Sequence, residues 1–172
     1  MSYSLEQFSA DCHKILSEKP APEGLDDVRL ALEKALVDED FIAANIGPEE
    51  TSGRKLLYED SELGFCIFAH SRGNKAKSPP HDHGRNWAIY GQVAGETAMT
   101  DWRKLTAPEG DNPGTVEAAE TYKLTPGTAR VYKVGDLHSP SRELPTRLIR
   151  IEGRNMDNEP QRDRYVVAEA VS

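Results

Sequence analysis

Apolar residues recur at helical spacing near the start of the chain. Leu5, Phe8 and Cys12 fall on one face, which predicts an amphipathic first helix. At the start of this helix, Ser4 and Gln7 have the spacing of a capping box. In this motif the side chain of each residue accepts a hydrogen bond from the backbone N–H of the other.

A second apolar stripe begins at residue 25 and predicts one helix that runs into the early forties. Its members share one helical face: Leu25, Val28, Leu32, Leu36 and Phe41. Gly47-Pro48 ends it, because glycine and proline terminate helices.

The pattern then changes to short β-prone runs separated by glycine and proline. The expected strands are residues 55–59, 65–69, 87–93, 97–105, 116–124, 128–134, 147–152 and 164–168. No strand–helix alternation occurs, which disfavours a parallel doubly wound sheet. We expect a mainly all-β single domain: a helical segment (1–47) packed on an antiparallel barrel (48–172).

Composition and charge narrow the class of protein. The chain has 172 residues, and 21 Lys and Arg stand against 29 Asp and Glu, a net charge of -8 that disfavours nucleic-acid binding. The apolar run 65–69 is too short for a membrane span, and no secretory signal is visible, so we expect a cytoplasmic protein. Cys12 and Cys66 form no CxxC pattern, which disfavours a disulfide scaffold.

Three of the five histidines have the spacing of a metal site. His81 and His83 lie two residues apart, so on an extended backbone their side chains share a face. His138 follows after four expected strands, at a strand start, which lets a barrel return it beside the first pair. Three imidazoles suit a divalent first-row metal and leave positions open for substrate. We expect His13 and His70 to have ordinary structural or surface roles.

The first of these motifs resembles that of the cupin superfamily. His81 and His83 match its His-x-His, Ala88 stands where most members carry a glutamate ligand, and Gly95 matches the closing glycine.

The second cupin motif is similar to the segment from Gly127 through Gly135 to His138, with Lys133 where many members carry proline. The resemblance covers about residues 78–153. It implies a jelly-roll-like double-stranded β-helix of six to eight strands with a bound metal.

Three histidines without a carboxylate resemble the thiol dioxygenases of the cysteine dioxygenase type. Residues 79–84, Pro-Pro-His-Asp-His-Gly, and Trp87 look like the bacterial branch of that family. The resemblance implies Fe(II) at His81, His83 and His138, with Zn, Ni or Mn as other candidates, and O2 with a small thiol as substrates.

The sequence departs from that family at two places. Its Ser-His-Tyr relay is replaced by Leu148, Arg150 and Glu152, and Ala88 occupies the cysteine position of the Cys-Tyr crosslink found in the animal branch. We therefore assign the family's three metal ligands to this chain but not the family's substrate.

The residues at the relay positions suggest two roles. Leu148, Arg150 and Glu152 share a parity, which predicts that all three point into the barrel. Arg150 and Glu152 either form an ion pair or act on the substrate, with Arg150 clamping a carboxylate. Arg85 and Arg72 are the other candidates for the clamp.

Further pocket residues follow from the expected strands. Tyr90 and Tyr132 either donate to bound oxygen or substrate or pack in the core. We expect Trp87, Ala88 and Leu148 to line the substrate pocket.

Three functions remain open. The first is an Fe(II) dioxygenase that acts on a small thiol or another carboxylate-bearing molecule. The second is a metal- or ligand-binding module without catalysis, and the third is a zinc or manganese hydrolase or isomerase. Open sheet edges favour a homodimer.

Overall fold

The computed structural model describes residues 2–51, 53–160 and 162–169. Within these residues three helices come first: α1 (Leu5–Glu18), α2 (Leu25–Leu36) and α3 (Glu39–Ile46). Ten strands follow: β1 (Arg54–Glu59), β2 (Cys66–Arg72), β3 (Ala76–Lys77), β4 (Ala88–Ala94), β5 (Thr97–Thr106), β6 (Gly114–Leu124), β7 (Ala129–Tyr132), β8 (Leu137–Arg142), β9 (Thr146–Glu152) and β10 (Tyr165–Val167). A short 3-10 turn, η1 (Met156–Asn158), lies between β9 and β10.

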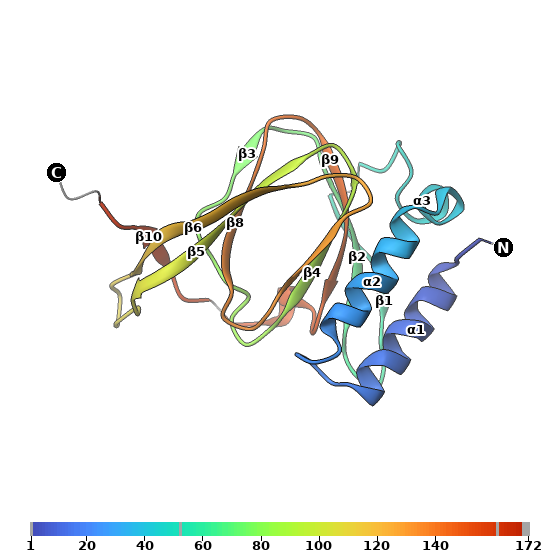
Figure 1. Ribbon diagram of the computed structural model, residues 1–172, viewed down its shortest axis with the longest axis horizontal. Helices are drawn as coiled ribbons and strands as arrows, with labels where there is room; N and C mark the ends of the chain where they lie inside the picture. The colour runs from blue at the N-terminus through green and yellow to red at the C-terminus, as the bar shows by residue number, and fades with distance from the viewer. Residues whose placement is uncertain (1, 52, 161, 170–172) are drawn as a thin grey trace.

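The strands form two five-stranded sheets that face each other (Figure 1). One has the order β1-β2-β9-β4-β7, which we call the helix-side sheet, and the other has the order β10-β6-β5-β8-β3. The pairing is antiparallel except between β10 and β6, which run parallel. A mainly antiparallel β-barrel with a helical N-terminal segment, as the sequence predicted, is confirmed.

The helices cover the outer face of the helix-side sheet (Figure 1). They enclose a large apolar core with that sheet, to which β9 contributes Ile149 and Ile151. Gly91 of β4 allows the close approach of α2, because a Cβ there would lie 2.8 Å from a methyl carbon of Leu32. The helices therefore close the outer face of the barrel and leave its interior to other residues.

The N-terminal helices differ from the prediction in one respect. The capping box of Ser4 and Gln7 is present at the start of α1. The prediction of one helix through the early forties is wrong, because α2 ends at Leu36 and α3 begins after Asp38. The Asp38 carboxylate accepts a hydrogen bond from the Phe41 backbone N–H, which starts a new helix at that point.

All eight expected strands are present with shifted ends. Two further strands are β3, which was not expected, and β8, of which only a strand start at His138 was expected. These two strands pair with each other, and β8 also pairs with β5. The strand expected at 65–69 extends to Arg72, which places His70 inside a strand rather than at its end. No helix in the described part of the chain is long and apolar enough to span a membrane.

Candidate metal centre

The segment that carries His81 and His83 is fixed against strand β8. His81 and His138 exchange both backbone hydrogen bonds: the His81 N–H donates to the His138 carbonyl at 3.0 Å, and the His138 N–H donates to the His81 carbonyl at 2.9 Å. The Asp82 carboxylate accepts from the Gly84 N–H, and Gly84 has a φ of 64°, which closes a turn directly after His83. The backbone thus places the two motif histidines opposite His138.

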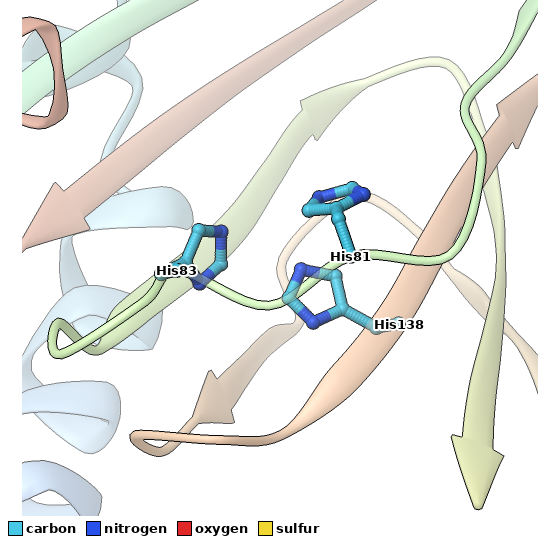
Figure 2. A group of neighbouring side chains, drawn as sticks. All are labelled: His81, His83 and His138. Carbon is cyan, nitrogen blue, oxygen red and sulfur yellow. The ribbon is translucent and has the colours of Figure 1, made fainter. Parts of the chain in front are cut away.

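The three histidines form one cluster, shown in Figure 2. One ring nitrogen of each lies within 4.8 Å of the other two, and the ring centroids of His81 and His83 are each 4.7 Å from that of His138. His83 and His138 are buried, whereas His81 is partly exposed at the rim. The cluster has an inner wall and one side open to solvent.

Backbone carbonyls orient two of the rings. The Nδ1 of His81 lies 2.9 Å from the Pro79 carbonyl, and that of His138 lies 3.1 Å from the Asp136 carbonyl. A carbonyl only accepts, so Nδ1 carries the proton in the neutral ring and Nε2 keeps its lone pair. Both rings therefore present Nε2 as a metal ligand.

The third ring has a nitrogen without a protein partner. The Nε2 of His83 lies 2.9 Å from the Tyr90 hydroxyl, while its Nδ1 is buried and has no hydrogen bond to any described residue. The same Tyr90 hydroxyl reaches the Nε2 of His138, so the Nε2 atoms of His83 and His138 lie on the same side of the cluster. Three clustered imidazole nitrogens fit a bound transition metal.

The surroundings keep all three imidazoles neutral. Burial, and next the positive charge of Arg150, lowers the pKa of His83 far below its ordinary value. Burial and the neighbouring His81 lower the pKa of His138 to about 3, and burial also lowers that of His81. The neutral imidazole is the form that binds a metal, so the donor set is ready at neutral pH.

Two tyrosines contact the cluster in different ways. The Tyr90 hydroxyl lies 2.9 Å from His83 and 3.4 Å from the Nε2 of His138. Tyr132 stacks on the His138 ring at 4.1 Å, and its hydroxyl pairs with that of Tyr122 at 2.7 Å. Burial raises the pKa of both, so both hydroxyls stay protonated. Tyr90 supplies a hydroxyl at the site, and Tyr132 supports a histidine ring.

The inner face of β9 carries an ion-pair network beside the triad. Glu152 is fully buried, and Arg54 binds both its oxygens, with each nitrogen–oxygen distance 2.9 Å. The Nε of Arg150 lies 2.9 Å from the same carboxylate, and its guanidinium carbon lies 4.7 Å from the Tyr90 ring centroid. Arg54 also donates to the Nε2 of His70 at 3.1 Å. Arg150 and Glu152 are therefore neighbours in one network.

This network borders an open cleft of about 690 Å³. The lining includes His81 from the triad, Arg150 and Glu152 from β9, and His70 from β2. A molecule in the cleft can reach the exposed side of the triad and the Arg150 guanidinium together.

The remaining expected pocket residues lie in different places. Ala88 is buried between the sheets near Tyr90, and Leu148 packs against the same cluster. Arg85 is exposed on the turn after the metal motif. Trp87 lies in the core beneath the helices rather than beside the triad, because it has the outward parity of Ile89.

Two residues of the site were missed by sequence reasoning. His70 faces the barrel and lines the cleft, and Arg54 stands opposite it in the register of β1 and β2. The parity that His70 shares with Phe68 on a longer strand is the one signal that could have located it. Arg54 gave no such signal, because its role depends on the register between strands.

Comparison with known proteins gives likeness in fold alone. No family model matches the sequence, and no curated protein matches it. Among solved structures, the Schizosaccharomyces pombe Cnp3 cupin domain is 12% identical over 59% of this chain and 64% of its own, with a TM-score of 0.44. KdgF from Halomonas sp. is 20% identical over 60% and 82%, with a TM-score of 0.45. A cupin-2 domain containing protein from Shewanella frigidimarina is 12% identical over 65% and 83%, with a TM-score of 0.43.

The architecture and the site define the class of the protein. Two facing sheets form a mainly antiparallel β-barrel with a helical N-terminal segment, and the His-x-His segment and β8 bring together three histidines that could hold a metal ion.

Proposed function

We propose that this chain is an Fe(II)-dependent cupin dioxygenase that oxidises a small thiol or another small carboxylate-bearing molecule with O2. The observation that carries the proposal is a cluster of three neutral histidines without a carboxylate, beside an arginine that faces the same cleft. His81, His83 and His138 would hold the metal.

The donor set favours an anionic substrate at the metal. Ala88 supplies no ligand, and the Glu152 carboxylate opposite it on β9 is held by Arg54. Three neutral ligands leave the double positive charge of a divalent ion uncompensated. The ion would therefore favour an anionic ligand such as a thiolate. Bound iron would supply the redox chemistry and open positions for thiolate and O2.

The reaction balances without a further reductant. A thiolate and O2 give a sulfinate, in which both oxygen atoms form new bonds to sulfur. Sulfur loses four electrons, and O2 gains four as its O–O bond breaks. The side chains therefore need to position and shield the reactants rather than supply electrons.

The protein's groups provide that positioning. Arg150 lines the cleft next to His81 and offers a planar fork to a carboxylate. The protonated Tyr90 hydroxyl, which lies between His83 and His138, can donate to a bound oxygen atom. The stacked Tyr132 ring holds His138 in place.

The test is oxygen consumption by the Fe(II)-loaded protein with cysteine, 3-mercaptopropionate and cysteamine, which lacks a carboxylate. We expect uptake with the two carboxylate-bearing thiols, weaker uptake with cysteamine, and loss of both iron and uptake in His138→Ala. His13→Gln, which changes a histidine on α1 remote from the triad, is the control and should retain iron. Full iron occupancy in His138→Ala would exclude the triad, and no uptake with iron bound would exclude the thiol reaction.

A second candidate is a metal- and ligand-binding module without catalysis. It is favoured by the relay positions, where Arg150 and Glu152 form an ion pair instead of a proton-transfer chain. Tight ligand binding without turnover under Fe(II), Zn(II) or Mn(II) would support it. Turnover with zinc or manganese and without O2 uptake would instead indicate a hydrolase or isomerase.

A further inference from the structure

A second cavity lies between the two sheets next to the metal centre. Its volume is about 170 Å³, and it shares His81, His70, Arg150 and Arg72 with the open cleft. Arg142 from β8 lines this cavity and not the open cleft. No carboxylate stands among the described residues that line it.

The positive charges of this cavity are poorly compensated. Arg72 and Arg142 form no ion pair with any described residue, and the Nε of Arg142 donates only to the Asn74 carbonyl at 2.8 Å. Arg150 has Glu152 as its ion-pair partner, but Arg54 already binds both oxygens of that carboxylate. Three guanidinium groups thus meet at a cavity without a negative charge of its own.

Burial, followed by the charge of Arg72, lowers the pKa of Arg142. Like charges brought together in a partly buried site cost free energy unless an anion joins them. An oxyanion between the arginines would remove this cost.

Two uncharged groups add hydrogen-bonding capacity. The Thr146 hydroxyl is buried without a partner among the described residues, and Thr146 lines the cavity. His70 accepts a hydrogen bond at Nε2 from Arg54, which can only donate, so the neutral ring carries its proton on Nδ1. That Nδ1–H has no partner among the described residues, which leaves it as a donor.

We propose that this cavity binds a second oxyanion of the substrate, separate from the group at the metal and from the carboxylate that Arg150 would hold, so that the ligand has a further negatively charged end held by Arg72 and Arg142. The proposal rests on the proposed function for the placement of the reacting group beside His81. It narrows the substrate class from a small molecule with one carboxylate to a small molecule with a second oxyanion besides that carboxylate. The second group is an oxyanion, either a carboxylate or a phosphate.

The test compares ligands that differ in one charge. Isothermal titration calorimetry of the full chain, as purified and after zinc loading, would use succinate, butyrate and inorganic phosphate. Succinate and butyrate have the same number of carbons, so their difference reports the second carboxylate. We expect succinate to bind at least about tenfold more tightly than butyrate, since its second carboxylate gains charged hydrogen bonds that butyrate cannot form. Phosphate that binds more tightly than succinate and competes with it would assign the site to a phosphate group.

Variants then locate the site. Arg72→Gln and Arg142→Gln should each weaken succinate or phosphate about tenfold and leave butyrate unchanged. Arg142→Lys, which keeps the charge, should recover part of the affinity and separates charge from folding. Arg103→Gln, which removes the same charge from the exposed β5–β6 hairpin, should have no effect. Equal affinity for succinate and butyrate with no phosphate binding, or affinities unchanged in both glutamine variants, would overturn the proposal.

The results distinguish a failure of the oxyanion site from a failure of the proposed function. A charge preference lost in Arg142→Gln would support the oxyanion site even if the chain bound no metal. The opposite result is metal binding and O2 uptake that depend on His138, with equal affinity for succinate and butyrate. It would support the dioxygenase and contradict the second oxyanion of the substrate.

Discussion

The two faces of the helix-side sheet have opposite chemistry, although they are made by alternate residues of the same strands. On β9, Ile149 and Ile151 point toward the helices and are fully buried in the apolar core. Arg150 and Glu152, between and after them, point into the barrel. The larger apolar core therefore lies outside the barrel, and the barrel interior holds charged groups beside a smaller apolar cluster.

This division explains how the chain accommodates buried charge near the triad. A small barrel that relied on its interior for stability would need apolar side chains there. Here the helices supply the apolar partner for the outer face, so the inner face can hold an arginine–glutamate network and three histidines. Variants of the two faces should differ in stability, pH dependence and metal affinity.

The largest expected effect on stability comes from the outer face. Ile151→Ala should lower the free energy of unfolding by about 3 kcal/mol, because it leaves a cavity in a well-packed core. Its zinc affinity should stay within about twofold of the parent, since no atom of the site is removed. Urea denaturation and calorimetry measure the two quantities. Leu144→Ala, at a residue that is 72% exposed, is the control and should change stability by less than about 0.5 kcal/mol.

On the inner face, Arg54→Met should lower the free energy of unfolding by about 2–3 kcal/mol, for a reason other than a cavity. The change removes two charged hydrogen bonds from the buried Glu152 carboxylate and leaves it with less compensation. The double variant Arg54→Met/Glu152→Leu should lose less than the sum of the two single changes. Additive urea-denaturation values would show that the pair does not interact.

His70→Gln should change the pH dependence of stability, whereas Ile151→Ala should shift the whole curve evenly. The pKa of His70 is lowered from 6.5 to about 2 by burial and by the charges of Arg150 and Arg54. Below pH 6.5 the unfolded chain binds a proton that the folded chain does not, so acid lowers the free energy of unfolding.

Between pH 7.5 and 5.5, His70→Gln should therefore lose about 1 kcal/mol less stability than the parent chain. Urea denaturation at each pH measures the difference. The other buried histidines contribute equally to both proteins, so the comparison isolates His70. Parallel curves for variant and parent would place this histidine outside the buried network.

Much of the barrel could be predicted from short β-prone runs between turn residues, because these runs form strands in the structure. A strand start was expected at His138, but the extent of β8 could not be predicted, since its sequence Leu-His-Ser-Pro-Ser-Arg lacks apolar alternation and the strand depends on pairing with β5 and β3. The break between α2 and α3 was missed because the apolar stripe continues across it to Phe41, and only the Asp38 side-chain hydrogen bond marks the new start.

The site divides in the same way between local and long-range information. The grouping of His81 and His83 follows from their spacing of two, and parity places Arg150 and Glu152 inside the barrel. The partners of these two residues depend on strand register, which no local pattern specifies. Arg54, opposite His70 in the β1–β2 register, is the example.

The smallest effect tests the role of the helical segment as an outer cover. Ser4→Ala removes a side chain that accepts a hydrogen bond from the Gln7 backbone N–H at the start of α1. It should lower the free energy of unfolding by about 1 kcal/mol and leave zinc affinity and succinate binding unchanged.

Ser17→Ala is the matched control for this change, because it removes an exposed serine hydroxyl within the same helix. It should raise stability by a few tenths of a kcal/mol, roughly the difference in helix propensity between the two residues. If Ser4→Ala lowered zinc affinity severalfold while Ser17→Ala did not, α1 would be coupled to the metal centre. The separation between an apolar outer face and a chemical inner face would then be wrong. Unchanged zinc affinity at reduced stability would show that the helices stabilise the barrel without tuning its site.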